Sequence, residues 1–176
     1  MIISVEEAKK NVDFKDWTDE KVERKLKAIE QTIRAYTNNN FQQRTCRRTA
    51  DIVGSLFVVD ALTPFNIGDT VQISESDLNA GLFTVVSADD STFTVEEAVV
   101  DEAEVLVTKV SYPADVVECA LNLLEWEINN RAKVGIQSET LSRHSVTYFN
   151  MDGANQVMGF PASLLGCLKA YKKARF

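Results

Sequence analysis

Apolar residues recur at helical spacing in the first forty residues of this 176-residue chain. The stripe has spacings of four, three, four and three residues and consists of Val22, Leu26, Ile29, Ile33 and Tyr36. Residues at these spacings lie on one side of an α-helix, so the pattern predicts a helix of about five turns with one buried face.

Residues that cap helices stand at the ends of these patterns. In Ser4-Val5-Glu6-Glu7 the Ser4 hydroxyl can accept a hydrogen bond from the Glu7 backbone N–H, as in a capping box. A short helix is therefore expected to begin there and to end near Asn11. Thr18 is placed to cap the longer helix, and Asn38-Asn39-Asn40 to end it, because Asn tolerates the left-handed backbone of a helix terminus.

The pattern changes in the middle of the chain, where short runs rich in Val, Thr, Phe and Ile follow one another about every ten residues. These runs are Ser55–Asp60, Thr70–Ser74, Leu82–Ser87, Thr92–Glu96 and Val105–Lys109. Turn-forming sequences such as Gly68-Asp69 separate them. The spacing predicts a small antiparallel β-barrel or sandwich.

Helical spacing returns after Tyr112-Pro113, with Val117, Leu121, Leu124 and Ile128 on one stripe. Gly135 is expected to end this helix, and Pro161 to open a last one. The stretch between them is loop-like, with one extended candidate at residues 145–149.

The predicted fold class is therefore α+β. Residues 1–45 and 112–176 are expected to form a small helical bundle of about four helices. Residues 46–111 are expected to form an acidic domain inserted into it, a small antiparallel β-barrel or sandwich.

Composition and charge narrow the function. The net charge is −7, and residues 51–112 alone hold 12 acidic residues against one Lys, so DNA binding through this segment is not expected. No apolar run is long enough to span a membrane, and the early Glu6 and Glu7 do not fit a signal peptide. The three cysteines form no C-x-x-C pair and are interpreted as reduced thiols at apolar positions in a cytoplasmic protein.

Residue types that carry catalysis are scarce. His144 is the only histidine, and no G-x-S-x-G elbow, P-loop or G-x-G-x-x-G is present. Trp126 and the basic stretch Arg44–Arg48 could touch nucleic acid, but a core position and a helix–strand junction are the favoured interpretations. We assign no catalytic, cofactor-binding or metal-binding residue, and the chain is expected not to be an enzyme.

The last third of the chain carries its segments in a characteristic order. They are Tyr112-Pro113-Ala114-Asp115-Val116, an apolar helix, Gly135-Ile136-Gln137-Ser138-Glu139-Thr140-Leu141, Ser145-Val146-Thr147-Tyr148, Gly159-Phe160-Pro161, Leu164-Leu165 and Leu168-Lys169-Ala170-Tyr171-Lys172. With the short capped helix before a longer one, this order resembles the head–tail connector (adaptor) proteins of long-tailed bacteriophages and prophages. The resemblance covers about residues 1–45 and 112–176, and residues 46–111 look like an insertion.

The resemblance implies a structural virion protein without cofactors. Copies would form a ring of about twelve subunits under the portal protein, made in the host cytoplasm and placed at the head–tail interface. The ring would extend the DNA channel, without sequence-specific contact, and dock a stopper or tail completion protein. The residues expected to reach a neighbouring subunit are Ser138, Leu141, Val146 and Tyr148. Those expected to bind the portal are Lys169, Lys172, Lys173, Arg175 and Phe176.

Three alternatives stay open at this point. The chain could be a stopper or tail completion protein, or an interaction module whose strand-rich insert binds a protein partner. It could also be a small hydrolase that uses carboxylates between residues 69 and 104. The residues expected to reach a neighbouring subunit also have a simpler interpretation, a surface loop. Those expected to bind the portal have one too, a basic helix end that suits the helix dipole.

Overall fold

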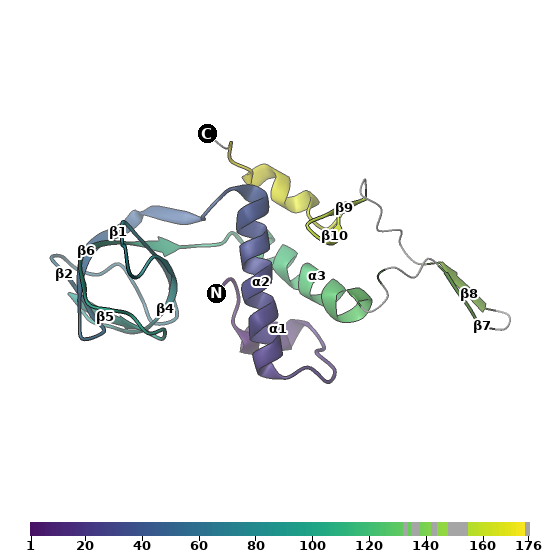
Figure 1. Ribbon diagram of the computed structural model, residues 1–176, viewed down its shortest axis with the longest axis horizontal. Helices are drawn as coiled ribbons and strands as arrows, with labels where there is room; N and C mark the ends of the chain where they lie inside the picture. Colours follow the sequence, from purple (N-terminus) through teal and green to yellow (C-terminus); the bar gives the residue numbers. More distant parts are fainter. Residues whose placement is uncertain (132–133, 135–137, 142–143, 148–154, 175–176) are drawn as a thin grey trace. The chain divides into compact units, whose positions relative to one another are not determined.

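The structure is a computed structural model that describes residues 1–131, 134, 138–141, 144–147 and 155–174. The chain divides into two compact units (Figure 1). Met1 and Asn40–Tyr112 make up the barrel unit, and Ile2–Asn39 with Pro113–Phe176 make up the helical unit.

The barrel unit is a closed barrel of six antiparallel strands, in the order β1-β2-β5-β4-β3-β6. The strands are β1 (Gln42–Val53), β2 (Leu56–Val59), β3 (Thr70–Ser74), β4 (Gly81–Ala88), β5 (Thr92–Val95) and β6 (Glu102–Val110). Pairing of β1 with β6, in which Arg48 lies opposite Val107, closes the barrel. Closure gives every strand two neighbours, so the barrel presents no open sheet edge.

Apolar side chains fill the interior of the barrel. On β2, Phe57 and Val59 are buried, while Leu56 and Val58 point outward and are exposed, as the two-residue period of a strand requires. Phe57 stacks on Phe93 directly opposite it, with ring centroids 4.5 Å apart. Phe65 meets the Phe93 ring edge-on. A barrel of this size is packed solid by such side chains, so its interior is a core and no channel.

The helical unit contains α1 (Val5–Asn11), α2 (Asp19–Thr37), α3 (Ala114–Asn130) and the 3₁₀-helix η2 (Gly166–Tyr171). It also contains two short hairpins, β7 (Ser138–Leu141) with β8 (His144–Thr147), and β9 (Gln156–Val157) with β10 (Phe160–Pro161). The predicted caps are confirmed. Ser4 accepts from the Glu7 N–H, Thr18 accepts from the Lys21 N–H, and Asn38 ends α2 in the left-handed conformation at φ 49°.

Buried faces of α2 and α3 form the core of this unit. On α2 the predicted positions Val22, Leu26, Ile29 and Ile33 are all buried, and Tyr36 at the end of the stripe is half-buried. On α3 the predicted positions Leu121 and Leu124 are buried, while Val117 and Ile128 are half-buried. The full buried set is Val116, Cys119, Ala120, Leu121, Leu123, Leu124 and Glu127. The predicted end at Gly135 lies outside the described residues.

The predicted fold class, a bundle of about four helices carrying an inserted barrel or sandwich, is wrong. The main architecture of the described residues is a closed six-stranded antiparallel barrel, and these residues contain three α-helices. The first barrel strand, β1, was not predicted, because its sequence from Gln42 to Thr49 is almost entirely polar. It is a strand because β2 and β6 supply partners for its backbone on both sides.

The predicted last helix is also corrected. Pro161 lies in β10, opposite Gln156, so it does not open a helix. The hydrogen bonds that follow run from residue i to residue i−3, as from Leu168 N to Leu165 O, which is the 3₁₀ pattern. Gly166, at the start of η2, is a poor α-helix former, which agrees with the short, tight turn seen here.

Candidate functional site

The segment predicted to reach a neighbouring subunit forms a hairpin. Ser138 and Leu141 lie in β7, Val146 lies in β8 opposite Glu139, and His144 lies opposite Leu141. Tyr148 lies outside the described residues. This sheet has two strands among the residues described, so each strand has one side without a strand neighbour. Two-stranded sheets of this kind are marginally stable alone in water and gain from an added strand.

The segment predicted to bind the portal is held at the C-terminal end of α2. Three backbone groups of residues 171–174 are engaged there. The Lys173 N–H donates to the Thr37 carbonyl at 2.8 Å. The Asn38 and Asn39 side-chain amides donate to the carbonyls of Ala174 and Tyr171, at 3.0 and 3.3 Å. The first bond satisfies the Thr37 carbonyl, which the end of α2 leaves without an intrahelical partner.

Cationic side chains of this segment reach solvent. Lys169, Lys172 and Lys173 are all exposed, and the Lys172 Nζ lies 3.7 Å from the centre of the Tyr36 ring. Cations are favoured near the negative end of a helix dipole, here that of α2. Arg175 and Phe176 lie outside the described residues. We name the exposed set Lys169, Lys172 and Lys173 the basic patch.

A hydrogen bond between Tyr171 and α3 anchors the basic patch from the other side. The Tyr171 hydroxyl lies 2.7 Å from both carboxylate oxygens of Asp115. This hydrogen bond, followed by burial, raises the pKa of Tyr171 above 10.0. The neutral hydroxyl donates this bond, which links η2 to the first turn of α3.

A buried carboxylate that sequence reasoning did not single out joins α2 to α3. Glu127 is 3% exposed and accepts a hydrogen bond from Lys25 on α2. It accepts another at 2.8 Å from Arg131, which directly follows α3. Arg131 also donates to the Gly159 carbonyl at 3.2 Å and lies over the rings of Trp126 and Phe160. Glu127 thus connects α2 to α3, and through Arg131 it is also linked to the β9–β10 turn.

Electrostatics keep Glu127 ionised. Burial by itself raises the pKa of this carboxyl, but the hydrogen bonds and positive charges of Arg131 and Lys25 outweigh it and hold the pKa below 4.5. An ionised carboxylate with both oxygens paired is suited to holding elements together and poorly suited to moving a proton. Trp126, whose ring meets Phe160 at 5.5 Å, belongs to the same structural junction.

Several carboxylates of the barrel unit also stabilise loops and turns through hydrogen bonds. Glu102 accepts from the Ser76 hydroxyl at 2.5 Å, from the Asp77 N–H at 2.8 Å and from the Asn79 amide at 2.7 Å. These bonds, the Ser76 bond first, lower the pKa of Glu102. Asp101 accepts from the Gly54 N–H at 2.7 Å, in the tight β1–β2 turn. Such carboxylates satisfy backbone N–H groups that the ladders of the barrel leave unpaired.

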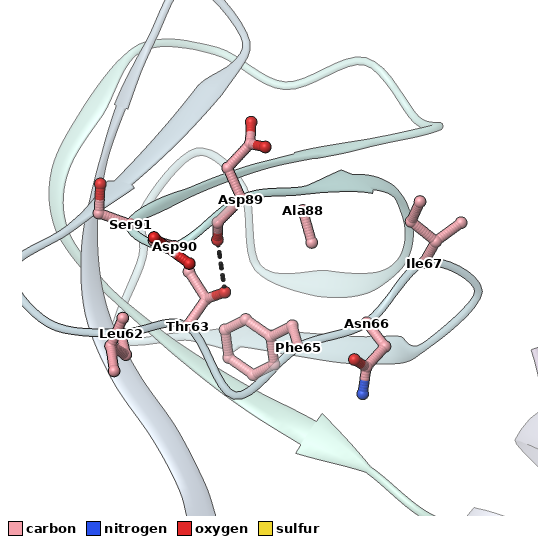
Figure 2. A pocket seen from close by; sticks show the side chains of 9 residues that line it. All are labelled: Leu62, Thr63, Phe65, Asn66, Ile67, Ala88, Asp89, Asp90 and Ser91. Carbon is pink, nitrogen blue, oxygen red and sulfur yellow. Dashed lines mark hydrogen bonds between the residues drawn. The ribbon is translucent and has the colours of Figure 1, made fainter.

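A hollow of about 950 Å³ lies beside the barrel core, and no pattern in the sequence indicated it (Figure 2). Its lining comes from the β2–β3 connection and the β4–β5 turn and consists of Leu62, Thr63, Phe65, Asn66, Ile67, Ala88, Asp89, Asp90 and Ser91. Thr63 bridges the two segments, because its hydroxyl donates to the Asp89 carbonyl and its N–H to the Asp90 carbonyl, each at 2.9 Å. Leu62 and Ile67, 69% and 70% exposed, lie on opposite sides of the view. All nine lining residues are described, and two of them are acidic and none basic.

Metal-binding and basic residues of the described part do not form a reactive site. Over the described ranges, no group of three or more His, Cys, Asp and Glu side chains is arranged to hold a metal ion. The Arg44–Arg48 stretch belongs to β1, where Arg47 donates to the Thr108 hydroxyl at 3.0 Å and Arg48 to the Leu62 carbonyl at 3.1 Å. In the same described part, no helix is both long enough and apolar enough to cross a bilayer.

Two comparisons with known proteins add no relative. A scan against protein-family models found no match for this chain, and neither did a search of curated proteins. The connector resemblance therefore rests on the order of the sequence segments alone.

Proposed function

We propose that this chain is a structural adaptor of a phage-type head–tail connector. Copies of it would stand as a ring below the portal protein, extend the DNA channel and dock the next connector or tail protein. In this proposal the protein works by attachment, and it is located in the virion at the head–tail interface.

The observation that carries the proposal is the basic patch and its support. Three hydrogen bonds join the backbone of the segment to the end of α2, one of them from backbone to backbone and two from Asn side chains. With the Tyr171–Asp115 bond they hold the segment in place, while its three lysine side chains remain exposed. A backbone held in place with exposed cationic side chains loses little conformational entropy when it meets a partner, so it is suited to docking on an acidic protein surface.

The hairpin β7–β8 supports the same proposal independently. Each of its strands has one side without a strand neighbour in the described sheet. An adjacent subunit could pair with either strand, which would convert a marginal two-stranded sheet into a larger one. Ring assembly requires such a heterologous contact.

Charge reversal tests the role of the basic patch without removing backbone. The variant carries Lys169→Glu, Lys172→Glu and Lys173→Glu, which leave the Lys173 N–H and the Tyr171 hydroxyl able to make their bonds. We expect it to fold with an unchanged far-UV circular dichroism spectrum and to lose attachment to the cognate portal protein in co-sedimentation.

A matched control reverses three other exposed cations of the helical unit, with Lys10→Glu, Arg24→Glu and Lys27→Glu. It has the same net charge as the test variant, so nonspecific repulsion would affect both alike. The control is expected to attach as the unmodified chain does. If the unmodified chain and both variants attach equally, the basic patch does not bind the portal. If both variants lose attachment equally, the overall charge of the chain and not the basic patch determines attachment.

The hollow of the barrel unit favours a second candidate, a protein-interaction module. Its two very exposed aliphatic side chains and its acidic rim fit a partner segment with an apolar side chain next to Lys or Arg. A photoreactive benzophenone at position 67 should cross-link one partner polypeptide in phage-producing cells, whereas the same group at exposed Glu20 on α2 should not. Equal labelling from both positions would remove this candidate.

A further inference from the structure

Two of the three cysteines meet at one point of the helical unit. Cys119 on α3 is buried, and its thiol donates to the Leu164 carbonyl at 3.3 Å. Cys167 on η2 is exposed, and its sulfur lies 3.6 Å from the same carbonyl oxygen. The two sulfurs therefore lie against the same carbonyl oxygen, from opposite elements of the unit. The sequence interpretation placed all three cysteines at apolar positions, and for Cys167 this is wrong.

We propose that Cys119 and Cys167 are a redox modification site, which a two-electron oxidant such as hydrogen peroxide converts to an intrachain disulfide. The bond would tie α3 to η2 and so fix covalently the segment that follows η2. The inference does not depend on the connector function, because it concerns only these two sulfurs and the helices that carry them.

The two thiols differ in solvent exposure, and this difference determines which sulfur reacts first. Cys167 is the exposed sulfur, so its thiolate meets peroxide first, takes up one oxygen as the sulfenic acid and releases hydroxide. The Cys119 sulfur then attacks the sulfenic sulfur. The S–S bond forms, the S–O bond breaks, and the departing hydroxide takes the Cys119 proton and leaves as water. In sum, two thiols and one peroxide give one disulfide and two waters.

The surroundings of Cys119 set the pace of the second step. Burial first, and then the hydrogen bond and charge of Cys167 and the charge of Asp115, raise the pKa of Cys119 well above 9.0. A thiol that resists ionisation attacks slowly, so the sulfenic acid on Cys167 should accumulate before the disulfide appears. Cys46, half-buried on β1 in the barrel unit, offers a third sulfur for comparison.

Peptide mapping after peroxide treatment of the whole chain tests the site. Trypsin places Cys119 in the peptide of residues 110–131 and Cys167 in that of residues 144–169, since these ranges end at Arg131 and Lys169. We expect the two peptides to become linked, with loss of two hydrogen atoms from the intact mass and no covalent dimer. Dimers joined through Cys167 or Cys46 would overturn the proposal, and so would an end product in which Cys167 carries added oxygen and Cys119 stays reduced.

Two variants separate the roles. Cys167→Ser changes an exposed residue and should leave Cys119 unoxidised. Cys119→Ser, whose hydroxyl can still donate to the Leu164 carbonyl, should leave Cys167 with one or more added oxygens and no link. The oxidised wild-type chain should show a melting temperature about 5–10 °C higher by tryptophan fluorescence. A lower melting temperature would mean that the bond distorts the native contact and would contradict the proposed geometry.

Discussion

Replacing Glu127 with Gln would remove a buried negative charge at the junction of α2, α3 and the β9–β10 turn. The Lys25 and Arg131 side chains would lose their common carboxylate partner. Removing one partner of a fully buried ion pair costs about 3–5 kcal/mol, because the other charge stays without solvation. Here the two cations are 35% and 42% exposed and can turn towards water, and Gln keeps one acceptor oxygen. We therefore expect a loss of about 2–3 kcal/mol in the free energy of unfolding of the helical unit.

Tryptophan fluorescence isolates this effect. Both tryptophans of the chain, Trp17 and Trp126, belong to the helical unit, so their signal follows its unfolding and not that of the barrel unit. With a urea dependence of about 1.5 kcal/mol per molar, the midpoint should fall by about 1–2 M in the Glu127→Gln variant. Glu125→Gln, on the exposed side of the same helix, is the matched control and should change stability by less than about 0.5 kcal/mol.

A further variant checks the reasoning about the cations. Lys25→Met should cost less than Glu127→Gln, because Arg131 still pairs with the carboxylate. If Glu127→Gln and Glu125→Gln have the same midpoint, the buried carboxylate does not hold the junction together. The assignment of Glu127 as its centre would then be refuted.

Three further predictions concern acid stability and the barrel. Because the pKa of Glu127 is lowered in the folded state, its contribution is present above pH 4.5 and is lost as the pH falls through the lowered pKa. The urea midpoints of the wild type and Glu127→Gln should therefore converge at pH values below 4.5; a constant difference would contradict this. Phe93→Ala removes a ring that is 1% exposed in the barrel core and should destabilise the barrel by about 3–5 kcal/mol. The loss should appear as faster hydrogen exchange in β2, β4 and β5, and unchanged exchange there would refute the packing described. Asn79→Ala removes side-chain hydrogen bonds to the Val100 N–H and carbonyl, at 2.8 and 2.9 Å, and should lower the stability of the barrel unit by about 2–3 kcal/mol. Hydrogen exchange should become faster in residues 96–102, and a change confined to other segments would show that Asn79 does not hold this segment.

Features set by neighbouring residues could be predicted from the sequence. The caps at Ser4 and Thr18, the end of α2 at Asn38 and the buried stripe of α2 all depend on side chains within a few residues of each other. The strands β3 and β5 are likewise marked by their own composition and by the turns beside them. A single sequence carries this information directly.

Features set by distant pairing could not be predicted. Strand β1 has a polar sequence, and it becomes a strand through β6, which lies about fifty residues further along the chain. Barrel closure depends on that same pairing, so the predicted bundle architecture was wrong. Local periodicity also missed Glu127, because a charged residue on a buried helix face is stable only with partners, and Lys25 lies on another helix.

The candidate sites show the same limit. The basic patch was predicted as the end of an α-helix, and its lysines could be named from composition, but its support by the end of α2 and by Asp115 is a tertiary feature. The hollow forms where the β2–β3 connection meets the β4–β5 turn, more than twenty residues apart in sequence. Neither segment alone carries a motif that would indicate it.

The most direct test of the adaptor proposal is negative-stain electron microscopy of the purified chain mixed with the portal protein of the same phage genome. The proposal predicts ring-shaped density added to one end of the portal, with several copies of the chain per ring, and loss of that density in the charge-reversed basic-patch variant. Portal particles without added density, beside a chain that remains monomeric at high concentration, would contradict it.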